Sequence, residues 1–265
     1  MPFITLLTDF GLKDGYVGAM KGVIWSIIPQ AQIADLSHEI APQNVMQAAL
    51  VLERTAGYFP AGTVHIAVVD PGVGTPRRPL AARLGNHTFV GPDNGLFSLV
   101  MARAEAARSP IEIVHLDRPE YWLPEVSRVF HGRDIFAPVG AHLANGVPLQ
   151  SVGAVIADPA RLSISQPEPG PDGWRGTVID IDAFGNLVTN VRQEHLAGLP
   201  RINIKIKNAL IKGLSQTFGD RPAGELTALI DSSGYLSIAV VNGSAASRLP
   251  AVVGDIIEIH GRRPS

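Results

Sequence analysis

Two segments combine acidic, basic or imidazole side chains with glycine, which is typical of loops that present polar groups to a ligand. Asp70 opens Asp70-Pro-Gly-Val-Gly-Thr-Pro-Arg77-Arg78 directly after an apolar run. The prolines and glycines of this segment predict a rigid loop whose backbone can approach a ligand closely. His131 stands between Phe130 and a glycine, and imidazole is readily used for proton transfer near neutral pH. These residues could perform acid–base chemistry, but the first loop taken alone favours an Asp–Arg ion pair that is only structural.

A third segment, Thr8-Asp-Phe-Gly-Leu-Lys-Asp-Gly15, follows the first predicted strand and carries Asp9 and Asp14. In a parallel α/β sheet, ligands bind at the carboxyl ends of the strands. A carboxylate at that edge can accept two hydrogen bonds from the diol of a ribose. The plainer interpretation is that Asp9 or Asp14 caps the helix that follows. This segment alone leaves both interpretations open.

The remaining histidines stand in no comparable motif, and we expect packing or surface roles for them. They are His38, His65, His87, His115, His142, His195 and His260.

Several classes of function are disfavoured by what the chain lacks. The Gly72-Val-Gly74 pair has no third glycine at dinucleotide spacing, and no Gly-Lys-Ser/Thr follows it, so a nucleoside triphosphate or NAD site is not expected. The 22 Lys and Arg against 24 Asp and Glu give a formal net charge of -2, without the basic field of a nucleic-acid-binding protein. The absence of cysteine excludes disulfides, thiolate nucleophiles and Cys-ligated zinc.

The composition is that of a globular protein. The chain has 265 residues, of which 46% are hydrophobic and 17% charged, enough to bury a substantial core. Its 27 glycines and 21 prolines predict many tight turns between short elements. No apolar run reaches the length of a membrane span, and no targeting signal is evident at the start. We therefore expect a cytoplasmic protein without membrane contact.

The elements that must position the first three segments form an α/β domain over residues 1–163. Apolar runs alternate with helix-like ones, which predicts a mainly parallel sheet covered on both faces. The predicted strands are 3–7, 32–36 and 63–69, and the predicted helices are 16–28, 44–58 and 135–143. Asp134 is expected to cap the last of these helices.

A linker is predicted at 164–173, where proline, glycine and polar residues show no apolar period. Residues 174–265 then form β-branched runs separated by turn signals, typical of a smaller all-β, barrel-like domain. Its predicted strands are 177–181, 202–206, 225–230, 236–241 and 255–260.

The second domain carries turns whose side chains could bind a nucleoside. Asp182, Phe184 and Asn186 offer an anion for an ammonium group, a ring to stack on a base and an amide for a purine edge. By itself the segment is an ordinary β-turn. Residues 231–234 and 242–246 are further turns of small residues.

Taken in order, these segments resemble one family along nearly the whole chain, the S-adenosylmethionine hydroxide adenosyltransferases, which are related to the fluorinase and chlorinase enzymes. The matching segments are Asp9-Phe-Gly with Asp14, Asp70-Pro-Gly-Val-Gly, Pro92-Asp-Asn-Gly95, Phe130-His-Gly-Arg-Asp134, Asp182 with Phe184-Gly-Asn186, and Asn242-Gly-Ser-Ala-Ala246.

The resemblance implies hydrolysis of S-adenosyl-L-methionine (SAM) to adenosine and L-methionine, with water or hydroxide attacking the ribose C5′. It implies a catalytic triad of Asp70, Arg77 and His131, with Arg78 as an alternative to Arg77. An aspartate paired with arginine is a weak base, so the resemblance leaves open whether Asp70 or His131 takes the proton.

The resemblance also assigns the groups that would bind substrate. Asp9 would hold the ribose hydroxyls, and two carboxylates would meet the methionine ammonium. Phe184, Asn186 and the backbone of Ala245 would line the adenine pocket, while two serines lie where the methionine carboxylate is held. The two carboxylates are those of Asp14 and Asp182, and the two serines are Ser232 and Ser233.

The related halogenases differ from this chain at four places. They carry Tyr at the position of Asp70, Ser at Gly132, Arg at Ser233 and an inserted loop at 84–88. The first two and the loop favour water over halide as the nucleophile. Because the sulfonium is already an activated leaving group, no metal or other cofactor is expected. The resemblance further implies a homotrimer with its ligand sites at subunit interfaces.

Other functions remain open from the residues alone. Asp9, Asp14, Asp70 and His131 could be the ligands of a metal-dependent phosphohydrolase. The same residues could serve a non-catalytic nucleoside-binding protein in which the triad is only an ion-pair network. A SAM-dependent halogenase is the nearest alternative.

Overall fold

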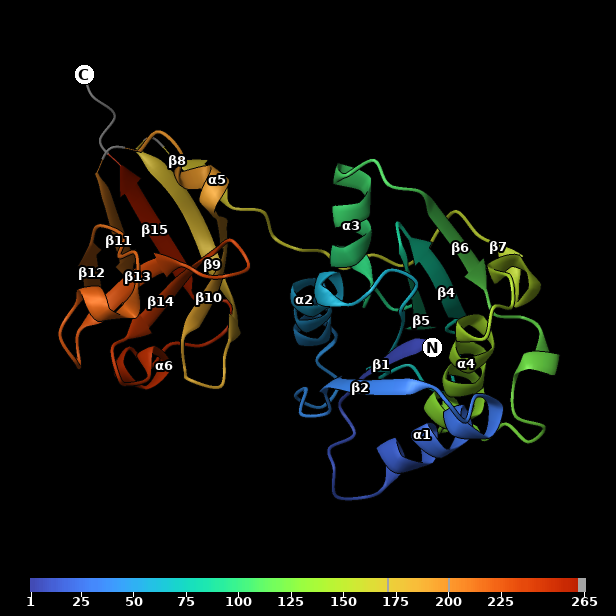
Figure 1. The fold of residues 1–265 in the computed structure, drawn as a ribbon. Coiled ribbons are helices and arrows are strands. Elements are labelled where there is room, and N and C mark those ends of the chain that lie inside the picture. The colour runs from blue at the N-terminus through green and yellow to red at the C-terminus, as the bar shows by residue number, and fades with distance from the viewer. Residues whose placement is uncertain (171, 200, 262–265) are drawn as a thin grey trace. The chain divides into compact units, whose positions relative to one another are not determined.

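The computed structural model describes residues 1–170, 172–199 and 201–261, and the chain divides into two compact units (Figure 1). The first unit is Met1–Leu162, and the second begins at Ser163. No helix among the described residues is both long and apolar enough to cross a membrane.

The first unit is built from seven strands and four α-helices. The strands are β1 (Phe3–Thr8), β2 (Gln32–Ser37), β3 (Val64–Val68), β4 (Pro79–Leu84), β5 (His87–Pro92), β6 (Ile111–His115) and β7 (Ala154–Val155). The α-helices are α1 (Tyr16–Ile27), α2 (Val45–Thr55), α3 (Ser98–Ala106) and α4 (Ala137–Ala144). Short 3-10 helices occupy Ala56–Tyr58, Pro119–Tyr121 and Leu149–Ser151, and a π-helix occupies Gly132–Phe136.

These strands form one mixed sheet in the order β2-β1-β3-β5-β4-β6-β7. β1 pairs in parallel with β2 and β3, and β3 with β5, whereas β4 is antiparallel to β5 and β6, and β6 to β7. The α/β class is confirmed, but a mainly parallel sheet is not. The cause is the two-residue turn Gly85-Asn86, in which a positive φ of 60° at the glycine lets β5 reverse directly onto β4.

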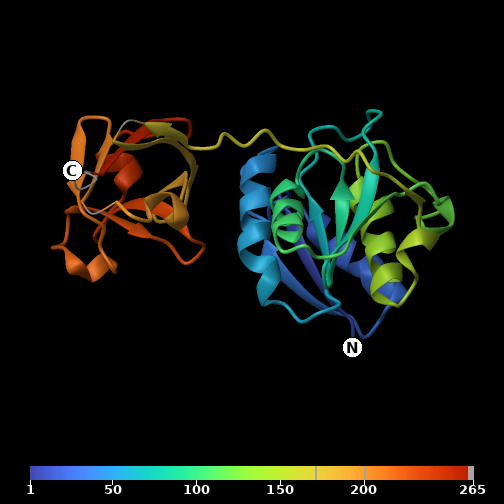
Figure 2. The ribbon, with the colours of Figure 1, turned by 90° about the horizontal axis from the view of Figure 1, so that it is seen from above.

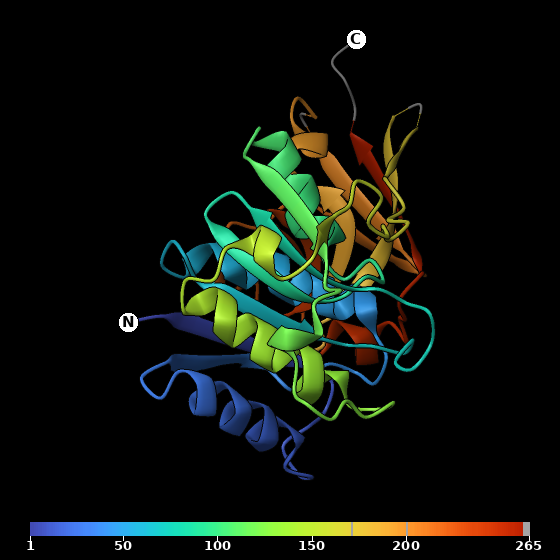
Figure 3. The same ribbon diagram turned by 90° about the vertical axis from the view of Figure 1, so that its right-hand side faces the viewer.

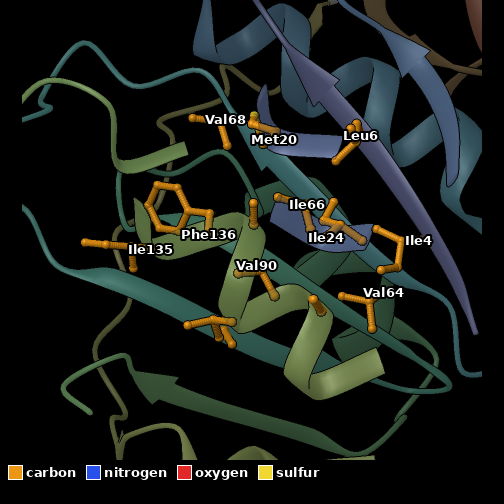
Figure 4. Close-up of a cluster of buried hydrophobic side chains, with 14 of the residues drawn as sticks. Ile4, Leu6, Met20, Ile24, Val64, Ile66, Val68, Val90, Ile135 and Phe136 are labelled. Carbon is orange, nitrogen blue, oxygen red and sulfur yellow. The ribbon is translucent and has the colours of Figure 1, made fainter. Parts of the chain in front are cut away.

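Helices cover both faces of this sheet, with α1 and α4 on one face and α2 and α3 on the other (Figures 1 and 2). α1 and α4 lie side by side (Figure 3). Figure 4 shows the core beneath them, where Met20 and Ile24 of α1 meet Leu6, Ile66 and Phe136. Burying a side chain of this size contributes roughly 1.5–3 kcal/mol, so the core fixes the strand ends that carry the candidate site.

All three predicted helices are present with shifted ends. α1 begins as expected, and α2 is capped by Asn44, whose side chain accepts the N–H of Gln47 at 3.0 Å. α4 follows the π-helix without a break, so the expectation that Asp134 caps it is wrong. The Asp134 carboxylate instead accepts the backbone N–H of Ser127 at 2.8 Å and Nε of Arg133 at 2.6 Å, which anchors the loop before the π-helix.

Over its described residues, the second unit is all-β apart from single helical turns. Its strands are β8 (Glu168–Gly170), β9 (Gly173–Ile181), β10 (Leu187–Arg192), β11 (Ile202–Ile206), β12 (Ala209–Lys212), β13 (Leu226–Ile230), β14 (Tyr235–Val240) and β15 (Ile256–Gly261). The helical turns are α5 (Gln193–Leu196), α6 (Ala245–Arg248) and a 3-10 turn at Phe218–Asp220.

The strands follow the order β12-β11-β15-β9-β10-β14-β13, with β8 paired to β9, and the assigned pairs are antiparallel. The sheet curls into a nearly closed barrel. The backbone N–H of Ser215, just after β12, donates to the carbonyl of Ala228 on β13 at 2.8 Å. The predicted linker 164–173 differs from expectation, because 168–170 form β8 and β9 already begins at Gly173.

Candidate active site

The three candidate segments of the first unit gather around the carboxyl ends of its parallel strands. Asp9 directly follows β1, and Asp70 lies two residues after the end of β3. His131 stands at the N-cap of the π-helix, whose next turns pack into the core through Phe136. Such π-helical turns occur frequently at functional sites.

Arg77 joins Asp70 to His131. Its Nε donates to Oδ1 of Asp70 at 3.1 Å, and its Nη2 forms a short contact with Oδ2, so the guanidinium holds the carboxylate with two nitrogens. Nη2 also lies 3.0 Å from Nδ1 of His131. The side chains of Arg77 and Asp70 are only 7% and 5% exposed. A paired, largely desolvated aspartate with an imidazole beside it can orient a polar reactant and hold charge near it.

The contact with Arg77 fixes the protonation of His131. A guanidinium only donates, so Nδ1 must accept, and a neutral His131 carries its proton on Nε2. Burial and the positive charge of Arg77 lower the pKa of His131 below its ordinary value, against the opposing effect of Asp70 and Asp134. His131 is therefore neutral at pH 7 and presents an Nε2–H donor.

The structure separates the two adjacent arginines. Arg78 faces away from the triad, where Nε donates to Oδ2 of Asp93 at 2.9 Å and Nη1 to Oδ1 of Asp158 at 3.0 Å. Asp93 also accepts the backbone N–H of Ala160 at 2.7 Å. Arg78 thus braces two loops, and of the two arginines it is Arg77 whose guanidinium contacts Asp70 and His131.

Asp9 is held by a backbone group from the loop after β2. Its Oδ2 accepts the N–H of Gln43 at 2.8 Å, and Gln43 has a φ of 64°, a conformation uncommon outside glycine. Asp9 does not cap α1, whose N-cap is Gly15 without a side-chain hydrogen bond. Asp14 is exposed in the bend before that helix. The Gln43 contact could not be found from sequence, because a backbone N–H leaves no residue-type signal.

An aromatic cluster links the Asp9 segment to the His131 segment. Phe10, Tyr16 and Phe130 contact one another edge to face, with ring centroids 5.3–6.0 Å apart. A Cβ added at Gly132 would lie 3.3 Å from the ring of Phe10 and 3.4 Å from Sδ of Met20. The glycine therefore lets the two segments approach closely.

In the second unit, Asp182 organises the turn between β9 and β10. Its Oδ1 accepts the backbone N–H groups of Phe184 and Asn186, both at 2.9 Å, and its Oδ2 accepts Nδ2 of Asn186 at 2.8 Å. The Asp182 and Asn186 side chains are thus bonded to each other. Phe184 projects from this turn with 79% of its surface exposed.

The segment 242–246 packs against the same turn. The backbone N–H of Ala246 donates to the carbonyl of Gly185 at 2.9 Å, and Gly185 has a φ of 79° with the Ser244 side chain where a Cβ would stand. Only glycine fits this position. Ala245, which begins α6, is fully buried.

The two candidate serines lie in the turn between β13 and β14. Asp231 holds that turn, with Oδ1 accepting the N–H of Ser233 at 2.8 Å and of Tyr235 at 3.0 Å. Ser232 is exposed and Ser233 half-buried.

Among the side chains described, no group of three or more histidines, cysteines, aspartates and glutamates is arranged to hold a metal ion. The nearest contacts of His131 and Asp70 are to Arg77, a cation itself.

Comparison with known proteins identifies the family. The family model described as "SAM hydroxide adenosyltransferase N-terminal domain" matches residues 4–153, and the corresponding C-terminal domain matches 176–258. A protein of Salinispora arenicola named (R)-S-adenosyl-L-methionine hydrolase is 39% identical over 261 residues, 97% of each chain. A fluorinase of Nocardia brasiliensis is 28% identical over 275 residues, 90% of each chain.

A crystal structure of an uncharacterized conserved protein from Thermotoga maritima is similar to this chain, with a TM-score of 0.88 and 38% identity. It is matched over 97% of this chain and 99% of its own. From these matches, the chain belongs to the SAM hydroxide adenosyltransferase family.

Proposed function

We propose that this protein is an enzyme that hydrolyses S-adenosyl-L-methionine to adenosine and L-methionine. The observation that carries the proposal is the Asp70–Arg77–His131 arrangement at the carboxyl ends of the parallel strands. The names of relatives at 34–39% identity, all (R)-S-adenosyl-L-methionine hydrolases, support it.

In the proposed reaction, a water oxygen forms a bond to C5′ while the C5′–S bond breaks and its electron pair passes to sulfur. The sulfonium becomes a neutral thioether, so the leaving group needs no protonation. Water loses one proton overall. Neutral His131 has its Nδ1 engaged by Arg77 and its proton on Nε2, so it accepts no proton while that contact lasts.

We therefore assign the proton-accepting role to Asp70 and a donating role to His131. Nε2–H of His131 would donate to a water lone pair and orient the water toward C5′. The Asp70 carboxylate would receive the water proton and pass it to solvent. Arg77 would hold Asp70 and His131 at a fixed separation. Its buried Nη1 has no hydrogen-bond partner among the described residues.

The substrate contacts are proposed from the family pattern. Asp9, with one oxygen held by Gln43, would accept the ribose hydroxyls through its remaining lone pairs. Asp14 is exposed and could meet the methionine ammonium. The exposed ring of Phe184 would stack on adenine, beside Asn186.

The remaining assignments follow the same pattern. Asp182 would join Asp14 at the ammonium, the Ala245 backbone would border the adenine, and Ser232 and Ser233 would hold the methionine carboxylate. Oδ2 of Asp182 keeps a lone pair for this role, because it accepts one hydrogen bond within the turn, whereas Oδ1 accepts two.

Halide transfer is the second candidate, favoured by the fluorinase relatives at 28% identity. Gly132 argues against it, because the serine that halogenases carry there would crowd Phe10 and Met20. Asp70 argues against it as well, since a carboxylate repels an anionic nucleophile.

We further propose that the enzyme is a cytoplasmic homotrimer with substrate sites at its subunit interfaces, and that it needs no metal or other cofactor. Light scattering should give three times the chain mass of 28.2 kDa. A monomer at working concentration would contradict the trimer.

The proposed activity is tested by incubating the purified protein with SAM and separating the products. Because the named relatives specify the (R) form, both sulfonium epimers are supplied. We expect equal amounts of adenosine and methionine, unchanged by a chelator such as EDTA and by added fluoride or chloride. Loss of activity with EDTA would favour the metal-dependent hydrolase, 5′-halo-adenosine a halogenase, and binding without products a nucleoside-binding protein.

A further inference from the structure

A chain of polar side chains leads from α1 to the last residue of β1, beside Asp9. Nζ of Lys21 donates to Oδ2 of Asp35 at 2.6 Å, and Oδ1 of Asp35 lies 3.1 Å from Nε2 of His38. On its other side, Nδ1 of His38 lies 2.8 Å from Oγ1 of Thr8. The His38 side chain is 2% exposed and Thr8 is fully buried. The packing or surface role expected for His38 does not explain this series of polar contacts.

The direction of each contact follows from the groups involved. Burial raises the pKa of Asp35, but the contacts with Lys21 and His38 outweigh that effect and hold it below its ordinary value, so the carboxylate is charged. Nε2 of His38 faces the negative charge of Asp35 at 3.1 Å, which favours a proton on Nε2, and Nδ1 then accepts the hydroxyl proton of Thr8. The Thr8 oxygen then accepts the backbone N–H of Phe10 at 3.2 Å.

His38 also holds the segment through its backbone. The N–H of Gly11 donates to the carbonyl of His38 at 2.8 Å. Asp9 therefore lies between Thr8, which is held by the His38 side chain, and Gly11, which is held by the His38 main chain. Oδ2 of Asp9 is fixed in turn by the N–H of Gln43, five residues further along the same loop.

We propose that His38 is a positioning residue for Asp9, which sets the orientation of the carboxylate that receives the ribose diol. The proposal rests on the proposed function, in which Asp9 accepts the ribose hydroxyls. His38 acts through Thr8 and Gly11. Without the imidazole, the Thr8 hydroxyl loses its acceptor and the backbone at Phe10 loses a fixed partner. The contacts to Gln43 and to the His38 carbonyl remain, so Asp9 is held less firmly in the orientation that receives the ribose.

The effect should appear in substrate binding more than in the chemical step. A ribose contact is made equally in the ground state and the transition state, and losing it raises KM while leaving kcat nearly unchanged. For His38→Ala we expect KM for SAM to rise about tenfold, the size of one lost hydrogen bond, with kcat within about twofold. His38→Asn places an acceptor where Nδ1 stood and should recover most of this loss.

The pattern of ribose recognition separates positioning from a general loss of stability. The wild-type enzyme should prefer SAM over its 2′-deoxy analogue, and His38→Ala should narrow that preference. The matched control is His65→Ala, which removes another fully buried imidazole that contacts a threonine of β1, Thr5, at 2.7 Å. This control should lower Tm and leave both KM and the ribose preference unchanged.

Each outcome bears on one claim. If the wild-type protein neither binds nor converts SAM, the proposed function fails and the role of His38 fails with it. If the wild type converts SAM while His38→Ala keeps its KM and its ribose preference, the positioning role is wrong and the function stands. If His38→Ala does not fold, Thr8→Val removes the same hydroxyl with little change in shape and must show the same rise in KM.

Discussion

At the scale of single residues, chemistry follows from which group each side chain contacts. Arg77 and Arg78 are adjacent and identical in type, so sequence alone could not choose between them. The loop turns Arg77 toward Asp70 and Arg78 toward Asp93, and the two guanidinium groups acquire different partners. The tautomer of His131 is likewise a consequence of contact, because Arg77 makes its Nδ1 an acceptor.

Replacing each arginine by lysine tests whether Arg77, and not Arg78, serves the catalytic triad. Arg77→Lys keeps the charge but cannot hold Asp70 with two nitrogens and reach His131 as well, so we expect kcat to fall about 100-fold. Arg78→Lys is the matched control, because its side chain is 31% exposed and bonded to Asp93 and Asp158. It should keep kcat within about twofold. Equal losses in steady-state assays of the two variants would contradict the assignment.

At the scale of elements, the sequence predicted what periodicity and capping determine. β1, β2, β3 and α1 were predicted close to their observed positions because apolar runs bounded by polar turns are local signals. The strands β4 and β5 were not predicted, and the antiparallel half of the sheet was missed with them. β10 was missed because it begins directly after the Asp182 turn, whose polar side chains predict a turn and not a strand. Strand pairing depends on distant partners and has no comparable local signal.

Packing between β1, β3 and β5 buries His65 and makes the free energy of unfolding depend on pH. His65 contacts Thr5 and stacks on Phe89 with ring centroids 4.9 Å apart. Burial, helped by the nearby His87, lowers the pKa of His65 to about 3 from its ordinary value of about 6.5. Between these two values the unfolded chain binds more protons than the folded one, so the free energy of unfolding decreases as pH falls.

The expected contribution of His65 is about 1.4 kcal/mol per pH unit below pH 6.5. Urea denaturation at pH 7 and pH 5 measures it, with His65→Ala losing less stability than wild type over that interval. The control is His260→Ala, whose side chain is 52% exposed and which should follow the wild-type slope. Identical slopes for wild type and His65→Ala would show that the buried imidazole is not the acid-sensitive group.

At the scale of the whole molecule, the candidate residues are divided between two units with separate cores. The triad and Asp9 belong to the first unit, and Phe184, Asn186 and the turn serines belong to the second. Composition and pattern predicted two domains of different class. The assignment of both sets to one substrate came from the ordered motifs alone, since no single segment specifies it.

The most direct test of the account is the origin of the oxygen in the product. SAM is converted in water enriched in oxygen-18, and adenosine and methionine are analysed by mass spectrometry. Attack of water on C5′ predicts one heavy oxygen at the 5′ position of adenosine and none in methionine. Unlabelled adenosine, 5′-halo-adenosine, or methylthioadenosine with homoserine would contradict the proposed hydrolysis at C5′.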